Sequence, residues 1–245
     1  GPHTGLLRCL NMLDAHQVKS TFFVPGAVAE KYTEQVRMIH ERGHELACHG
    51  YRHESVRGIS REEEEAILDK SEAALMAVTG KRPAGHRGPE SIIHPFTHEL
   101  LAERGYLYSS SMKDCDYAYL WEQDGKELPL VELPNDITMD DFTYYYFTFG
   151  DPAVRAMYTN REVLGNWKAE FDGLAEEGDK IFVLKLHPQM IGRASRIAMV
   201  GDFISYMKGH GAWITTCENV ARYVLNQHKL PENGSAPEHH GKEAL

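Results

Sequence analysis

The chain has 245 residues, of which 42% are hydrophobic and 25% are charged. This composition is enough to bury the core of one α/β barrel-type domain, and it excludes disordered and collagen-like chains. The formal net charge of −10 argues against a nucleic-acid or anionic-membrane partner. No run of residues approaches the roughly 18 consecutive apolar residues of a transmembrane helix.

The elements predicted in chain order begin with a helix that carries Leu6, Leu10 and Leu13 on one face. Short β-branched or aromatic runs then alternate with segments of helical periodicity up to residue 226. Seven strands are predicted, over residues 20–24, 45–48, 83–86, 106–109, 130–133, 180–186 and 212–215. Further helices are predicted over residues 28–42, 60–79, 97–104, 160–177, 197–208 and 216–226.

This alternation is typical of a parallel sheet or a β/α barrel. Ser60 and Glu63 predict a capping box at the start of the third helix. The aromatic run at residues 140–150, DDFTYYYFTFG, is expected to pack beneath a long loop rather than to form a sugar platform. One domain is predicted over residues 1–226, followed by a polar tail at residues 227–245.

The spacing of the four cysteines indicates the redox environment of the protein. They lack CxxC spacing and match neither a zinc knuckle nor a dense disulfide framework, so a reducing cellular compartment is favoured. No charged and apolar leader is visible, although the chain starts without Met. A cytoplasmic location is therefore expected, while a secreted or envelope location stays open. The four residues are Cys9, Cys48, Cys115 and Cys217.

His49 and His53 are the first candidate site residues, within the segment HGYRH. Two histidines four residues apart lie on one face of a helical turn and can bind one cation. They follow a predicted strand, at the edge where barrel active sites form. A metal site and a surface turn with two solvated histidines are both compatible with this spacing.

Two further candidates follow predicted strands. His187 comes directly after the most apolar run, and a histidine, with an unperturbed pKa of about 6.5, can donate a proton to a leaving amine. Arg87 can orient a carboxylate through its charged planar group. A structural histidine and a surface arginine are the alternative interpretations.

A hydrolytic zinc ion needs three protein ligands and a neighbouring base. The sequence offers two convincing ligands and no obvious carboxylate. Asp140 and Asp141 follow a strand, but their spacing does not place them, and Glu45 and Glu54 are expected to point elsewhere.

The order of several motifs resembles the NodB-homology polysaccharide deacetylases. More narrowly, it is similar to the branch with peptidoglycan-deacetylase-like proteins, cyclic imide hydrolases and PuuE-type allantoinases. The motifs are TFFVPG at residues 21–26, RGHELACHGYRHE at 42–54, GHRGPE at 85–90, LLAERGYLYSSSM at 100–112 and LHPQMIGRASRIAM at 186–199. The fold that the resemblance implies is an α/β, distorted (β/α) barrel, here without its first strand.

The resemblance also implies roles for residues. His49 and His53 match the ligands of a divalent metal ion, expected to be zinc. Arg87 matches the arginine that orients a catalytic aspartate, and His187 matches the histidine that protonates the leaving nitrogen. The segment around these motifs suggests four substrate-binding residues, Gly88, Pro89, Glu90 and Pro188. The implied reaction is metal-assisted attack of water on an amide carbonyl.

The sequence departs from the family pattern at two informative places. The family's first motif supplies an aspartate that is both the third ligand and the base, and we expect it upstream of Gly1. Glu90 occupies the position where many carbohydrate-active members carry an aromatic residue. This difference weakens the argument that the substrate is a sugar.

Three functions therefore remain open at the level of sequence. The first is a deacetylase of N-acetylated polysaccharide or peptidoglycan. The second is a ring-opening hydrolase of a cyclic imide or allantoin. The third is a catalytically silent barrel with a binding role. The partner is expected to be a glycan or a small molecule, and the resemblance implies a homo-oligomer, with tetramers among similar proteins.

Overall fold

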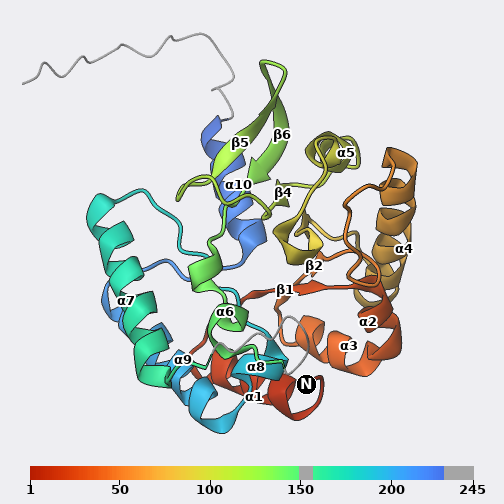
Figure 1. Cartoon of the computed structure of the whole chain (residues 1–245). Coiled ribbons are helices and arrows are strands. Elements are labelled where there is room, and N and C mark those ends of the chain that lie inside the picture. The colour runs from red at the N-terminus through yellow and green to blue at the C-terminus, as the bar shows by residue number, and fades with distance from the viewer. Residues whose placement is uncertain (149–156, 229–245) are drawn as a thin grey trace, which may run out of the picture.

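The computed structural model describes residues 1–148 and 157–228. A six-stranded sheet lies at the centre of these residues, in the order β1-β2-β3-β4-β6-β5 (Figure 1). Adjacent strands are parallel except for β5, which pairs antiparallel with β6. The strands are β1 Thr21–Val24, β2 Glu45–Cys48, β3 Gly85–His86, β4 Tyr108–Ser109, β5 Tyr119–Gln123 and β6 Lys126–Glu132. The predicted α/β class is confirmed.

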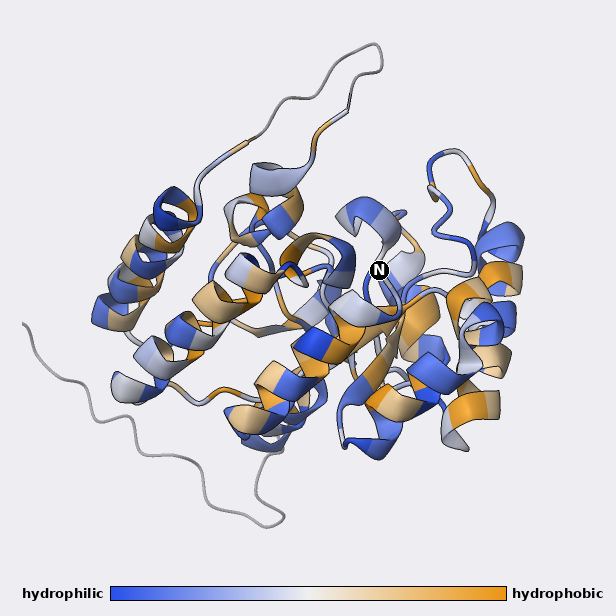
Figure 2. Cartoon of the chain, turned by 90° about the horizontal axis from the view of Figure 1, so that it is seen from below, coloured by the Kyte–Doolittle hydropathy of each residue, from blue (hydrophilic) through white to orange (hydrophobic). Residues whose placement is uncertain are grey.

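Helices connect and cover the strands because parallel neighbours need crossover connections. In Figure 1, α2, α3 and α4 gather on one side of the sheet, α7 and α9 on the other, and α1 and α8 lie together. Figure 2 shows that hydrophobic and hydrophilic residues alternate along these helices, as in amphipathic helices that cover a core. The helices are α1 Thr4–Ala15, α2 Gly26–Lys31, α3 Thr33–Glu41, α4 Arg61–Thr79, α5 Thr97–Glu103, α6 Asp141–Tyr145, α7 Asn160–Glu177, α8 Pro188–Ile191, α9 Ala194–Gly209 and α10 Cys217–His228, with 3₁₀ turns η1 Pro89–Ser91 and η2 Ile137–Met139.

Local signals fix the ends of the two longest helices. Ser60 and Glu63 form the predicted capping box of α4, and Gly80 ends that helix in the left-handed conformation. Thr159 caps α7 in the same way. The helix predicted over residues 28–42 is wrong as one element, because Tyr32 leaves the helical conformation and separates α2 from α3.

Two predicted strands are wrong. Residues 212–215 form no strand, and residues 180–186 contribute a single parallel bridge, between Asp140 and Lys185. The apolar side chains of the second run, among them Phe182 and Leu184, pack instead into a helix-lined cluster around Trp167. A buried apolar run alone does not distinguish a strand from an extended segment that packs on helices.

The hairpin of β5 and β6 was not predicted. Its turn has positive φ at both Asp124 and Gly125, 51° and 75°, which is the geometry that favours Asp-Gly in a two-residue hairpin. It places β5 at one edge of the sheet.

The aromatic run at residues 140–150 is partly buried, as predicted. Tyr144 and Tyr145 lie in the core, although they belong to the short helix α6 rather than to a loop. Residues 149 and 150 lie outside the described residues.

Two of the remaining expectations bear on the whole chain. Most of the predicted tail, residues 229–245, falls outside the described residues, so its character stays a prediction. Among the helices of residues 1–148 and 157–228, none combines the length and the apolar character needed to span a bilayer.

Candidate active site

Two of the predicted site residues directly follow the carboxyl ends of neighbouring strands. His49 comes directly after β2 and Arg87 directly after β3, while Ser110 follows β4. His187 occupies the N-cap position of α8. Carboxyl ends of parallel strands meet at one edge of a sheet, which is where α/β barrels carry their sites.

The structure brings His49 and His53 together, with ring centroids 4.9 Å apart. The predicted helical turn is wrong, because Gly50 and His53 have φ values of 67° and 64°, and these values break a helix. The turn is held instead by Glu54, whose carboxylate accepts a hydrogen bond from the Tyr51 amide at 3.0 Å. The two imidazoles therefore meet through an irregular turn.

The hydrogen bonds of His49 determine which ring nitrogen is free. Its Nδ1 lies 2.7 Å from the carbonyl oxygen of Arg87, so Nδ1 donates and Nε2 remains available. Burial lowers the pKa of His49 to about 3, and nearby His53, Arg87 and His187 add to this lowering. A neutral imidazole with one oriented free nitrogen is the form that binds metal ions.

Hydrogen bonds to Ser110 hold the side chain of Arg87 in place. Its Nε donates to the Ser110 carbonyl at 2.9 Å and its Nη2 to Ser110 Oγ at 2.7 Å, while the guanidinium lies 4.1 Å from the centroid of the Phe23 ring. Burial lowers the pKa of Arg87. No carboxylate of the described residues forms an ion pair with this guanidinium, so its charge is available to orient an anionic group.

His187 forms a close pair with Asp141. Its Nδ1 donates to Asp141 Oδ1 at 2.6 Å and its backbone amide donates to Oδ2 at 2.9 Å. Asp141 is completely buried, and this burial raises the pKa of Asp141 against the opposing effect of His187. A carboxylate in this position fixes the orientation of the ring and stabilises its protonated form.

The four predicted substrate-binding residues directly follow Arg87 and His187 along the chain. Gly88 allows a close approach of the backbone, because a Cβ there would lie 2.1 Å from the Ile92 oxygen. Pro89 packs against the turn at Gly50, and Glu90 is exposed with φ of 57°. The carbonyl of Pro188 faces α1 at Gly5. No contact of these four residues with a substrate is tested by the structure, so their roles stay predictions.

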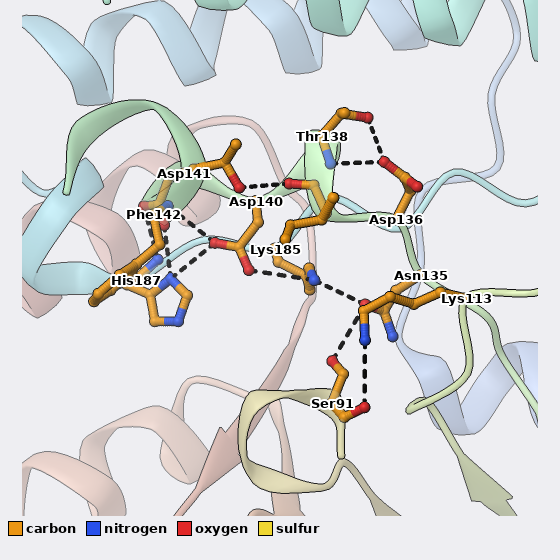
Figure 3. Close-up of polar contacts among 12 residues, drawn as sticks. Ser91, Lys113, Asn135, Asp136, Thr138, Asp140, Asp141, Phe142, Lys185 and His187 are labelled. Carbon is orange, nitrogen blue, oxygen red and sulfur yellow. Dashed lines mark hydrogen bonds and ion pairs between the residues drawn. The ribbon is translucent and has the colours of Figure 1, made fainter. Parts of the chain in front are cut away.

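His49 and His53 are the residues that could hold a divalent ion, since they provide two neighbouring imidazoles and His49 is neutral. Within residues 1–148 and 157–228, no third His, Cys, Asp or Glu completes a cluster with them. The metal-spaced cluster among these residues consists of Asp140, Asp141 and His187. Asp140 of this cluster forms an ion pair with Lys185 (Figure 3), with Nζ 3.2 Å from Oδ2.

Several residues of this region were not predicted from the sequence. Asp141 follows a predicted strand, but spacing alone does not place it beside His187, 46 positions away. Lys185 carries a signal that could have identified it, because a lysine interrupts the apolar run IFVLKL just before His187. Buried charged residues are rare unless they are paired. Nothing in the local sequence of Asn135 or Ser110 marks them.

Comparisons with known proteins agree on one family. A family model described as polysaccharide deacetylase matches residues 1–109. The chain is 28% identical over 236 residues to the peptidoglycan deacetylase of Helicobacter pylori, covering 86% of this chain and 80% of that protein.

The solved structures that are similar along most of the chain include the following two. One is a Mycobacterium smegmatis protein described as a polysaccharide deacetylase, with 34% identity, a TM-score of 0.87, and coverage of 97% of this chain and 82% of the other. The second is PuuE allantoinase, with 26% identity, a TM-score of 0.80, and coverage of 91% and 73%.

Proposed function

Because this chain belongs to the polysaccharide deacetylase family, we propose that it removes acetyl groups from an N-acetylated polysaccharide or peptidoglycan with the help of a bound divalent metal ion. Its reaction class is hydrolysis of carbon–nitrogen bonds other than peptide bonds. The observation that supports the proposal is the presence of two chemically distinct histidine sites, the His49–His53 pair and the His187–Asp141 pair, near enough for His187 to lower the pKa of His49.

The residues have separate roles in this reaction. His49 and His53 hold the ion, which we expect to be zinc and which polarises the amide carbonyl when it is bound. As water adds to the carbonyl carbon, it loses one proton to solvent. The C–N bond then breaks, and protonated His187 gives its proton to the leaving nitrogen. Asp141 keeps the ring in place and stabilises its positive charge, and Arg87 orients an anionic group at the floor of the site.

Ring opening of a cyclic imide or of allantoin is the second candidate, and two observations favour it. The similarity to PuuE allantoinase extends over 91% of the chain. The exposed carboxylate of Glu90 also offers hydrogen-bond acceptors to a ring N–H rather than an aromatic face to a sugar. The broken bond is again a C–N bond of an amide, so the roles of His187 and Asp141 are unchanged.

The metal ion is tested by measuring its content in the purified protein after incubation with zinc. About one equivalent per chain is expected in the parent protein, and its loss in His53→Ala. His3→Ala is the matched control, because His3 is exposed and its side chain makes no capping hydrogen bond. Equal zinc content in the parent and in His53→Ala would contradict the assignment of the ligands.

The substrate class is tested with two probes. N-acetylglucosamine oligomers should release acetate, whereas a hydantoin or cyclic imide should lose ultraviolet absorbance without acetate. Acetate release from the oligomers supports the deacetylase, and ring opening supports the second candidate. No reaction with either probe by the zinc-loaded protein would indicate a silent barrel.

A further inference from the structure

Lys185 is a buried cation in the middle of the site region. Its side chain is 8% exposed, and Figure 3 shows it between Asn135 and Asp140. Its Nζ lies 2.8 Å from Asn135 Oδ1 and 3.2 Å from Asp140 Oδ2. Both partners are acceptors, which suits an ammonium group with three donors. Burial lowers the pKa of Lys185, and the nearby carboxylate of Asp140 opposes this effect.

Two carboxylates face the same imidazole. Asp141 Oδ1 lies 2.6 Å and Asp140 Oδ1 3.6 Å from His187 Nδ1. An unbalanced second negative charge at this distance would compete for the Nδ1 proton and hold the ring in its charged form. The ammonium of Lys185 supplies the balancing positive charge, so that Asp141 is left as the single effective partner of His187.

The backbone fixes this arrangement. The amide of Asp141 donates to the Lys185 carbonyl at 3.1 Å, and the amide of Lys185 donates to the Met139 carbonyl at 2.8 Å. The start of α6 and the residue two before His187 are therefore joined directly, and the side chain of Lys185 leaves this junction towards Asn135.

Asn135 continues the connection to the other half of the site. Its Nδ2 donates to the Ser110 carbonyl at 3.0 Å, the same oxygen that accepts from Arg87 Nε at 2.9 Å. Since Nδ2 faces a carbonyl, Oδ1 is the amide atom that faces Lys185. A continuous set of polar contacts thus joins Arg87 to Asp140 through buried groups.

We propose that Lys185 is a positioning residue of the hydrolytic site: its ammonium neutralises Asp140, reserves His187 for Asp141, and fixes His187 relative to Arg87. This inference rests on the proposed function, since it assigns His187 as the proton donor. It adds a residue that touches neither substrate nor metal.

A double-mutant cycle tests the charge balance. We expect Lys185→Met to lower kcat by at least about 10-fold with KM changed less than about 3-fold, because the misplaced ring affects the chemical step. Asp140→Asn keeps the oxygen that caps Phe142 at 2.9 Å, removes the negative charge, and replaces the oxygen that faces Lys185 with an amide NH2 group. The double variant Lys185→Met/Asp140→Asn should therefore recover most of the lost kcat. A double variant no better than Lys185→Met would overturn the proposal, because packing alone predicts no rescue.

A second readout does not depend on activity. In protein labelled with ¹⁵N at histidine, the ring nitrogen signals of His187, identified by their absence in His187→Gln, should shift in Lys185→Met and return in the double variant. If Lys185→Met fails to fold, Asp140→Asn alone should shift the same signals, since it leaves the ammonium unbalanced. Unchanged signals in the folded variants would refute the role of Lys185. If the parent protein hydrolyses neither probe but the His187 signals shift as described, the proposed function is refuted while the contact between Lys185 and the His187 site is supported.

Discussion

Both carboxylate oxygens of Asp141 accept hydrogen bonds from the same residue, His187. Oδ1 accepts from the imidazole ring and Oδ2 from the backbone amide. Because Asp141 has no exposed surface, water cannot replace either bond. At the scale of single residues, this pair is the most strongly constrained part of the candidate site.

Replacement of Asp141 by Asn should lower kcat by about 100-fold or more, the range typical of losing a general acid. The amide can present an N–H to Nδ1, and this favours the wrong ring tautomer. Steady-state kinetics on the better of the two probes measures the effect. Asp172→Asn is the matched control, because Asp172 accepts a hydrogen bond from Tyr206 on α9, away from His187. Equal losses in the two variants would contradict the role of Asp141.

The candidate residues that could be predicted from the sequence are those that follow a strand directly. His49, Arg87 and His187 were identified in this way. The proximity of His49 and Arg87 follows from parallel strands that end at one edge, whereas His187 is placed by the start of α8. The contacts of Asp141 with His187 and of Lys185 with Asn135 could not be predicted, because they join segments 46 and 50 positions apart. Such contacts depend on how α6 and the preceding loop pack, and no local spacing encodes that.

At the scale of secondary-structure elements, the backbones of helices α1 and α8 lie very close to each other. A Cβ at Gly5 would lie 2.3 Å from the Pro188 oxygen, and one at Gly192 would lie 2.5 Å from the Cα of Gly5. Glycine at both positions lets the backbones touch. Since His187 is the N-cap of α8, the placement of this short helix also places the histidine.

Gly5→Ala should therefore lower the free energy of unfolding by about 1–3 kcal/mol, as overpacking of a core does, and should also reduce kcat. Chemical denaturation and kinetics measure the two effects. Gly173→Ala in the exposed part of α7 is the control, because nothing lies within 4 Å of its Cβ position. That change should stabilise the protein by about 0.5–1 kcal/mol, the usual advantage of Ala over Gly in a helix. If Gly5→Ala changes neither the free energy of unfolding nor kcat, α8 can shift to accommodate the added methyl group, and the prediction is wrong.

Helix α4 shows how local end signals predict an element from the sequence. The capping box at Ser60 and the breaker Gly80 identify α4 from the sequence alone. The hairpin turn Asp124-Gly125 is an equally clear signal, because Asp-Gly favours a two-residue hairpin. Residues 180–186 were assigned wrongly for a physical reason: a segment buried between helices needs the same apolar residues as a buried strand.

At the scale of the whole molecule, three histidines are kept neutral by the fold. Burial lowers the pKa of His44 to about 4, and the pKa of His49 and of His86 to about 3. In the unfolded chain a histidine titrates near about 6.5. The unfolded state therefore takes up more protons at these three histidines between these values. Their contribution to the free energy of unfolding is greatest above about pH 6.5 and falls as the pH decreases towards about 3.

The melting temperature should accordingly fall between pH 7.5 and pH 4.5. His86 is 3% exposed, and its Nδ1 has no hydrogen-bond partner among the described residues, so His86→Leu should make this fall smaller. His3→Ala, which changes an exposed histidine, should leave it unaltered. Differential scanning calorimetry at both pH values measures the effect. A variant His86→Leu with the same pH dependence as the parent would contradict the explanation.

The polar connection from Arg87 through Ser110, Asn135 and Lys185 to Asp140 also has a consequence for folding kinetics. Its members come from segments that are far apart along the chain, and contacts of high sequence separation form only after long loops have closed. During refolding from denaturant, the far-ultraviolet circular dichroism of the helices should therefore return before hydrolytic activity does. If both signals recover with one rate constant, the two halves of the site assemble together with the helices rather than after them.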